Sequence, residues 1–233
     1  MINDFTIVIQ GRCELEQLQL WIDNYSDWYV VLSTWNDFDL NVKFPKNWKI
    51  VKSEYPTFTF DCQNLEKQVV STLTGLKEVN TEYVIKVRGD EYFSKLDLVY
   101  KIMKQNLPKV LCSSVCFRPL WLYPFHISDH FICSTTKNIK LMFEKCLEML
   151  SNVNKFNNCP ETHLGFSFIA GKENLNLFNL ENYLDRNEEL MKKWYQIIDI
   201  NELQPYIVTE SNIDSRIYYR DNYGYSNHHI KEL

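Results

Sequence analysis

The stretch YVIKVRGDEYF, residues 83–93, decides the fold. It begins with β-forming apolar residues, ends with two aromatic residues, and holds the segment Arg88-Gly89-Asp90-Glu91 between them. An acidic pair at the end of an apolar strand costs free energy if it is desolvated without a partner. The stretch therefore predicts a buried strand that ends where Asp90 and Glu91 meet a lysine, a metal ion or water.

Apolar runs and amphipathic segments alternate on both sides of this stretch. The sequence predicts strands at residues 5–10, 28–35, 48–55, 83–93, 109–119 and 130–135, and helices at 13–25, 64–79, 94–106, 138–150 and 179–198. Pro160 and Glu161 mark the start of a further helix. This order is typical of a mostly parallel sheet flanked by helices. We therefore expect an α/β, Rossmann-like protein with a single domain over residues 1–233.

Composition and charge exclude several classes of protein. The chain of 233 residues has a net charge of −5, so it lacks the basic footprint of a nucleic-acid-binding protein. No apolar run is long enough to span a bilayer, and no basic segment of a signal peptide precedes the first strand. Seven cysteines without a CxxC motif indicate reduced thiols, and hence a reducing compartment such as the cytoplasm. A zinc site through Cys112 and Cys116 is a minor alternative.

Polar residues follow each apolar run at the place where ligands bind in open α/β sheets, beyond the carboxyl ends of the strands. Arg12 and Arg88 can neutralise phosphate through bidentate hydrogen bonds. Asp90 and Glu91 can hold a divalent cation that bridges a diphosphate. The alternative is a rim of solvated loops in which Arg88 pairs with Glu91.

A nucleotide has further candidate partners at the same sheet edge. Ser33, Thr34 and Asp37 can bind a ribose or a base through hydrogen bonds, and Trp35 can stack on a ring. The first turn lacks GxGxxG, and the chain has no Walker lysine motif, which argues against a Rossmann dehydrogenase or a P-loop enzyme. The sequence predicts a nucleotide site made of Gln10, Gly11, Arg12, Ser33, Thr34, Trp35, Asp37, Lys86 and Arg88.

A second constellation lies in YPFHISDHFICS, residues 123–134. His126 and His130 can form hydrogen bonds with hydroxyl groups of a substrate, although a histidine that ties a loop to backbone carbonyls would have the same sequence. A carboxylate can accept the proton of a substrate hydroxyl, and Asp129 and Glu161 are the two candidates for such a base. Glu161 would be favoured at a helix start by the helix dipole even without that role.

The segments IQGR, VVLSTW, NLEKQVVSTLTGLKEVNTEYVIKVRGDEYF and FHISDHFICS occur in this order within residues 5–170. Together they resemble the WavE-type lipopolysaccharide synthesis family, a group of glycosyltransferases of bacteria and large DNA viruses. The resemblance implies a GT-A-like fold in which Asp90 occupies the place of an acidic DXD-type motif. Arg88 replaces the first acid of that motif, and Lys67 stands where the family has an arginine.

The resemblance implies a metal-dependent glycosyltransferase that moves a sugar from a nucleotide diphosphate sugar to a glycan acceptor. Residues 1–93 would form the half that binds the nucleotide sugar, with the predicted nucleotide site as its donor site. Residues 94–233 would form the half that binds the acceptor, with His126 and His130 at its hydroxyl groups and Asp129 or Glu161 as the base. Mn²⁺ or Mg²⁺ would bind at Asp90 and Glu91, and His228 or His229 could add a ligand. The alternatives are a sugar nucleotidyltransferase and a non-catalytic carbohydrate-binding or scaffold protein that keeps the fold.

Overall fold

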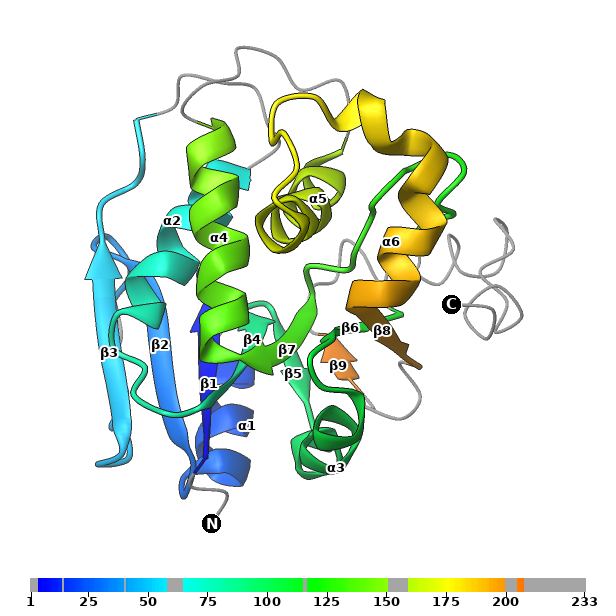
Figure 1. Cartoon of the computed structure of the whole chain (residues 1–233). Coiled ribbons are helices and arrows are strands. Elements are labelled where there is room, and N and C mark those ends of the chain that lie inside the picture. Colours follow the sequence, from blue (N-terminus) through cyan, green and yellow to red (C-terminus); the bar gives the residue numbers. More distant parts are fainter. Residues whose placement is uncertain are drawn as a thin grey trace.

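The computed structural model describes residues 4–13, 15–39, 41–57, 65–114, 117–150 and 159–199, and the backbone of 205–207. Its centre is a seven-stranded sheet with the strand order β3-β2-β1-β4-β7-β6-β8 (Figure 1). The strands are β1 (Phe5–Gln10), β2 (Tyr29–Trp35), β3 (Trp48–Ser53), β4 (Tyr83–Arg88), β6 (Val110–Ser113), β7 (Phe131–Thr135) and β8 (Tyr195–Ile198). A separate two-stranded sheet pairs β5 (Glu91–Phe93) with β9 (Pro205–Ile207).

Most strand pairs of the large sheet are parallel. β1 pairs with β2 and β4, β2 pairs with β3, and β6 pairs with β8, all in parallel register. β7 is the exception, because it runs antiparallel to both β4 and β6. The prediction of an α/β fold with a mostly parallel sheet flanked by helices is confirmed.

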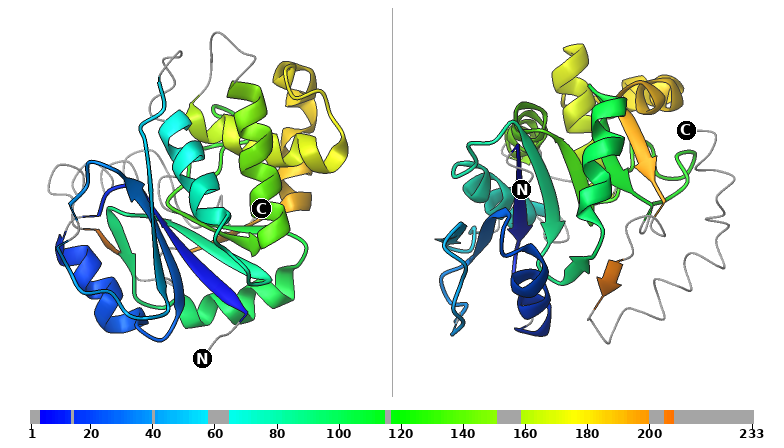
Figure 2. Two further views of the ribbon diagram at one scale, coloured as in Figure 1. Left: turned by 90° about the vertical axis from the view of Figure 1, so that its left-hand side faces the viewer. Right: turned by 90° about the horizontal axis from the view of Figure 1, so that it is seen from below.

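Helices cover both faces of the sheet (Figures 1 and 2). They are α1 (Leu15–Tyr25), α2 (Leu65–Leu76), α3 (Leu96–Asn106), α4 (Thr136–Leu150), α5 (Pro160–Glu173), the 3₁₀ helix η1 (Leu180–Arg186) and α6 (Asn187–Trp194). α1 and α3 share one hydrophobic cluster with the sheet, whereas α2, α4, α5 and α6 share the other. No helix among the described residues has the length and apolar character that a membrane crossing requires.

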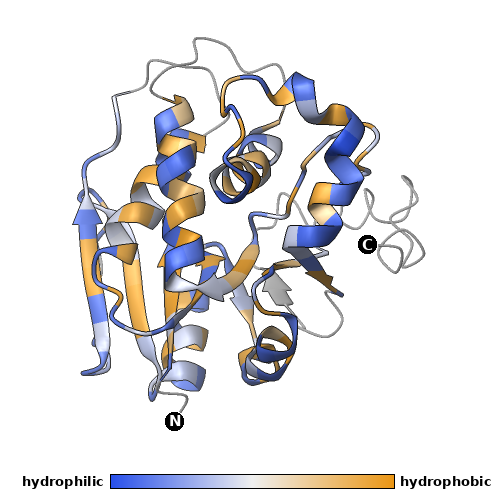
Figure 3. Cartoon of the chain, in the orientation of Figure 1, coloured by the Kyte–Doolittle hydropathy of each residue, from blue (hydrophilic) through white to orange (hydrophobic). Residues whose placement is uncertain are grey.

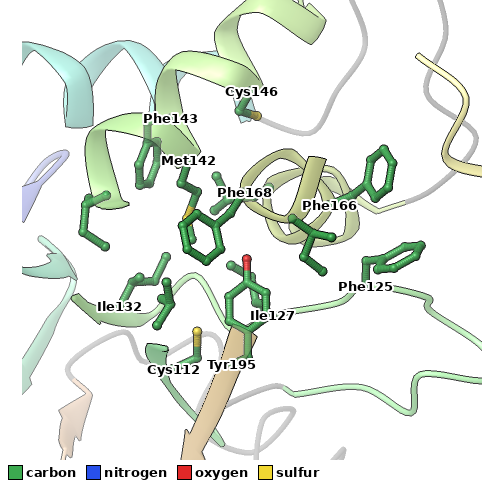
Figure 4. Packing of buried hydrophobic residues seen from close by; sticks show 14 of the residues in the cluster. Cys112, Phe125, Ile127, Ile132, Met142, Phe143, Cys146, Phe166, Phe168 and Tyr195 are labelled. Atoms are coloured by element: carbon green, nitrogen blue, oxygen red, sulfur yellow. The ribbon is translucent and has the colours of Figure 1, made fainter. Parts of the chain in front are cut away.

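The alternation of side chains along each strand builds these two clusters. In β1, Ile7 and Ile9 face the α1–α3 side, and Val8 faces the α2–α4 side. Figure 3 shows α4 and α6 striped in blue and orange, as expected for helices with one buried face. On the α5 side the cluster is rich in aromatic rings, among them Phe125, Phe166 and Tyr195 (Figure 4).

The structure departs from the predicted elements in two places. The strand expected over 83–93 is interrupted at Gly89 and Asp90, and its last part becomes β5 in the smaller sheet. The helix expected over 179–198 is divided into η1, α6 and the strand β8, because the β-forming residues at 195–198 pair with β6. Asn64, Cys116, the loop at 152–158, His228 and His229 lie outside the described residues.

Helix α5 contacts the loop before β7 very closely at Gly165. A Cβ atom at this position would lie 2.0 Å from the backbone oxygen of Phe125, and the Gly165 carbonyl accepts a 2.9 Å hydrogen bond from the Tyr195 hydroxyl. Gly171, on the same helix, would place its Cβ 3.0 Å from the side chain of Leu141, which can move. Only the first of the two glycines is therefore required by a backbone contact.

We predict that Gly165→Ala lowers the free energy of unfolding by about 2 kcal/mol or more, because overpacking against a backbone atom forces the helix to shift. Gly171→Ala is the matched control, and it should be neutral or slightly stabilising since alanine is the better helix former. Urea denaturation of both variants measures the difference. Equal stability of the two variants would contradict the packing described at Gly165.

Candidate functional site

A pocket of about 360 Å³ lies at the carboxyl ends of β1, β2 and β4, next to the first turns of α2 and α5. Its position agrees with the general location of ligand sites in open α/β sheets. The pocket is lined by Gln10, Gly11, Arg12, Trp35, Leu65, Lys67, Gln68, Arg88, Asp90, Asp129, Pro160 and Glu161. Eight of these residues are in the set predicted from the sequence, whereas Leu65, Lys67, Gln68 and Pro160 are additional.

The backbone brings the ends of β1 and β4 together at this pocket. Gly89 N–H donates a 2.7 Å hydrogen bond to the Gln10 carbonyl, and a Cβ at Gly89 would lie 2.3 Å from the carbonyl oxygen of Arg12. Gly11 has a φ of 98°, a conformation that glycine adopts without strain. The two glycines therefore allow Arg12 and Arg88 to line the same pocket.

Arg88 is the partner of Asp90. Its Nε and Nη2 donate hydrogen bonds of 2.9 and 2.7 Å to the two carboxylate oxygens of Asp90, and its Nη1 lies 3.6 Å from Asp129 Oδ2. The alternative pairing of Arg88 with Glu91 is not formed. This outcome agrees with the predicted placement of Arg88 and Asp90 on one side and Glu91 on the other, although Gly89 and Asp90 form a turn and not a continuous strand.

Glu91 is fully buried behind the pocket. Its carboxylate forms a short contact with Nδ1 of His130, and its backbone carbonyl accepts a 2.8 Å hydrogen bond from the indole of Trp21. Glu91 was expected to bind a metal ion and His130 to bind the acceptor. Their positions do not agree with these roles, because the two side chains contact each other inside the protein.

Lys86 and Asp129 are two buried charged residues at the bottom of the pocket. Lys86 is completely buried and donates a 2.6 Å hydrogen bond to the backbone carbonyl of Asp129, and burial lowers the pKa of its amine to about 8. Burial alone would raise the pKa of Asp129, but the charges of His130, Arg88 and Lys86 hold this pKa well below its usual range. Gln68 also donates a hydrogen bond to the Asp129 carboxylate.

Other residues of the predicted donor site lie away from the pocket. Ser33 is buried and donates a 2.6 Å hydrogen bond to the Ser71 carbonyl, so it joins β2 to α2. Thr34 is buried in β2, and Lys86 lies below the pocket floor. Asp37 is exposed and pairs with Arg12 at the pocket edge.

His126 is buried as well, and its Nδ1 accepts a 3.4 Å hydrogen bond from the backbone N–H of Arg118. Burial lowers its pKa to about 3, so the imidazole is neutral. This contact fits the alternative interpretation, in which the histidine ties a loop to the backbone. The backbone partner is an amide N–H and not the expected carbonyl. His126, Cys159 and Glu161 offer ligand atoms that lie within 4.8 Å of one another.

Glu161 lies half-buried in the first turn of α5, where Pro160 occupies the start of the helix as predicted. Burial raises the pKa of its carboxyl group, and the negative charge of Asp129 raises it further. Glu161 therefore holds a proton more readily than an exposed glutamate does. Asp129 is the opposite case, because its surrounding cations favour the carboxylate.

Asp90 and Glu91 do not fit the divalent cation that the resemblance implies. Mg²⁺ and Mn²⁺ require several free oxygen ligands, but both oxygens of Asp90 are bound by Arg88, and Glu91 is buried on the other side of the chain. A cation at Asp90 would have to break this pair and then lie beside the positive charges of Arg88 and Lys86. The pairing, rather than the number of acids, makes this end of β4 a poor metal site.

The mouth of the pocket carries an aromatic and cationic group in which Tyr55 and Lys67, which were not predicted as site residues, join the predicted residues Arg12 and Trp35. Tyr55 stacks on Trp35 with a ring separation of 4.5 Å and an interplanar angle of 20°. Arg12 Cζ and Lys67 Nζ lie 5.8 and 5.5 Å from the centre of the Tyr55 ring. The sequence did draw attention to Lys67, because this lysine stands where the family has an arginine. Tyr55 follows β3 and belongs to no motif that could have predicted its position.

Glu91 is fully buried and Asp90 is partly exposed, so replacing the carboxylate by an amide should affect stability differently at the two positions. We predict that Glu91→Gln lowers the free energy of unfolding by about 3 kcal/mol, because it removes one partner of a buried charged pair. Asp90→Asn changes the net charge equally and should cost under about 1 kcal/mol, since its pair with Arg88 is partly exposed. Urea denaturation at pH 7 compares the two, and equal losses would contradict the assigned environments.

Several solved structures are similar to this chain. Among solved structures, S. aureus TarS 1–349 is 14% identical with a TM-score of 0.45, and the similarity covers 71% of this chain and 55% of that one. The same protein in complex with UDP-GlcNAc gives 13% identity and a TM-score of 0.40 over 59% of this chain and 46% of that one. HddC from Yersinia pseudotuberculosis is 14% identical with a TM-score of 0.36, and the similarity covers 58% of this chain and 78% of that one.

The chain thus spans about half the length of TarS 1–349. No curated protein matches it. The family model described as WavE lipopolysaccharide synthesis matches residues 25–167, a range that holds Lys67, Arg88, Asp90, Asp129 and Glu161. Because this match covers more than half of the 233 residues, the chain belongs to the WavE lipopolysaccharide synthesis family.

Proposed function

We propose that the protein is a glycosyltransferase that moves a sugar from a nucleotide diphosphate sugar to a glycan acceptor. The observation that carries this proposal is the composition of one pocket, in which Arg12, Lys67 and Arg88 lie with the carboxylates of Asp129 and Glu161. Cations suit the diphosphate that leaves, and a carboxylate suits the acceptor hydroxyl that attacks. Membership of a lipopolysaccharide synthesis family supports the same chemistry.

The two parts of the chain contribute different groups to this pocket. We assign to the donor the lining residues that come from β1 and the turn after it, from the end of β2 and from the end of β4: Gln10, Gly11, Arg12, Trp35 and Arg88. Asp129 and Glu161 come from the loop before β7 and from the start of α5. We therefore assign residues 1–93 to the nucleotide sugar and residues 94–233 to the acceptor, within a single domain.

Glu161 is the better candidate for the base. A base must accept a proton near the working pH, and the raised pKa of Glu161 brings it closer to that range. Asp129 accepts a proton poorly because nearby cations lower its pKa, and its carboxylate is already bound by Gln68. We propose that Asp129 instead positions Arg88 and Gln68 at the floor of the pocket.

The proposed reaction is a displacement at the anomeric carbon of the donor. An oxygen of the acceptor hydroxyl forms a bond to that carbon, and its proton passes to the carboxylate of Glu161. The bond between the anomeric carbon and the diphosphate oxygen breaks, and the electron pair leaves with the diphosphate. Positive side chains at the carboxyl ends of β1 and β4 stabilise the charge that develops there.

We predict that Glu161→Gln lowers kcat at least about a hundredfold, which corresponds to about 2.7 kcal/mol in the barrier. In the native enzyme, kcat/KM should rise with pH through the raised pKa of Glu161, because only the carboxylate accepts a proton. The glutamine variant should lose this acidic limb of the profile. Glu173→Gln, at the other end of α5, is the control and should change neither kcat nor the profile.

A panel of nucleotide sugars, with UDP-GlcNAc among them, tests the proposed activity directly. We expect hydrolysis or transfer from one donor, with release of the matching nucleoside diphosphate. A sugar nucleotidyltransferase would instead release pyrophosphate from a nucleoside triphosphate and a sugar phosphate. A scaffold protein would bind none of the nucleoside diphosphates in isothermal titration, with or without Mn²⁺, and that result would refute the proposal.

A further inference from the structure

We propose that Arg12 and Lys67, held at the ring of Tyr55, neutralise the diphosphate of the donor, and that transfer requires no divalent cation. This inference rests on the proposed function, which it extends by adding Lys67 and Tyr55, two residues outside the predicted site, and by removing a cofactor from the reaction. It is carried by three observations: the aromatic stack at the pocket mouth, the two cations at one ring, and the pairing of Asp90 with Arg88.

The aromatic stack gives the two cations a fixed support. Trp35 is the last residue of β2 and is 4% exposed, so its ring is held by the core, and Tyr55 lies on it at 4.5 Å. A cation within about 6 Å of a ring centre is attracted by the face of the ring. Arg12 and Lys67 both meet this condition at Tyr55, and both line the pocket.

Two like charges at the same ring repel each other, and an anion between them relieves the repulsion. Arg12 is paired with Asp37, but both side chains are more than half exposed. Such an exposed pair contributes at most about 1 kcal/mol, so a phosphate oxygen can readily replace the Asp37 carboxylate. The arginine offers a bidentate site and the lysine a point charge, which together match two adjacent phosphates.

The charges at the floor of the pocket support the same assignment. Arg88 is held by Asp90 and lies near Asp129, so these three groups largely satisfy one another. A divalent cation would have to disrupt this group, whereas Arg12 and Lys67 are reached without any rearrangement of β4. The protein therefore supplies, from its own side chains at the mouth, the positive charge that a metal ion would otherwise bring to the leaving group.

The experiment measures the binding of inorganic pyrophosphate, and then of a nucleoside diphosphate panel, to the full chain by isothermal titration in excess EDTA. We expect binding in EDTA that changes less than about twofold when Mn²⁺ replaces the chelator. Lys67→Gln should weaken pyrophosphate binding at least tenfold, and Lys67→Arg should restore it to within about threefold. Lys49→Gln is the matched control, because Lys49 lies on β3, pairs with Glu78 and carries the same charge outside this pocket.

Tyr55 is a positioning residue in this proposal, and its variants separate support of the cations from general stability. Tyr55→Phe keeps the ring and should bind pyrophosphate as the native protein does, whereas Tyr55→Leu should bind at least fivefold more weakly. In the transfer reaction, Tyr55→Leu should raise KM for the donor and leave kcat nearly unchanged. Thermal melts of both variants verify that they fold.

Two outcomes would overturn the inference. One is binding or transfer that appears only with Mn²⁺ or Mg²⁺, in which case the glycosyltransferase proposal stands and the metal-free assignment fails. The other is pyrophosphate binding that Lys67→Gln and Lys49→Gln weaken equally. If pyrophosphate binds without metal and Lys67→Gln removes that binding, but no nucleotide sugar is consumed, the anion site is supported and the proposed function fails.

Discussion

The hydrogen bond from the buried amine of Lys86 to the carbonyl of Asp129 is the constraint on which the pocket depends. A lysine without solvent contact must find a carbonyl or an acid, since an isolated buried charge is very costly. In meeting this need, β4 fixes the loop that enters β7 and aims the Asp129 carboxylate at Arg88. The antiparallel pairing of Lys86 with Ile132 keeps this loop at the carboxyl end of β4.

Much of this arrangement could be predicted from local patterns in the sequence. The apolar runs and amphipathic segments gave the order of strands and helices, and strand alternation placed Arg88 and Asp90 on one side with Glu91 on the other. The rule for ligand sites in α/β sheets then located the pocket. These inferences succeeded because each depends on spacing within one segment, which the sequence displays directly.

Long-range pairings between side chains could not be predicted in the same way. The sequence shows acids and bases at the end of β4, but the pairing of Glu91 with His130 depends on how β7 and its loop pack. Tyr55 follows a weak edge strand and carries no pattern that would connect it with Trp35. The strand β8 was not predicted because its four residues, three of which are β-forming, directly continue an amphipathic helix.

The pairing of β5 with β9 has a consequence for any shortened form of the chain. β5 begins immediately after Asp90, and its antiparallel partner comes from residues 205–207, more than a hundred positions later. A truncation before residue 205 would thus remove a backbone partner of the segment that follows the pocket, although it would leave every pocket residue in place. The length of the expressed chain, and not only its side chains, is therefore a variable that governs the geometry at Asp90.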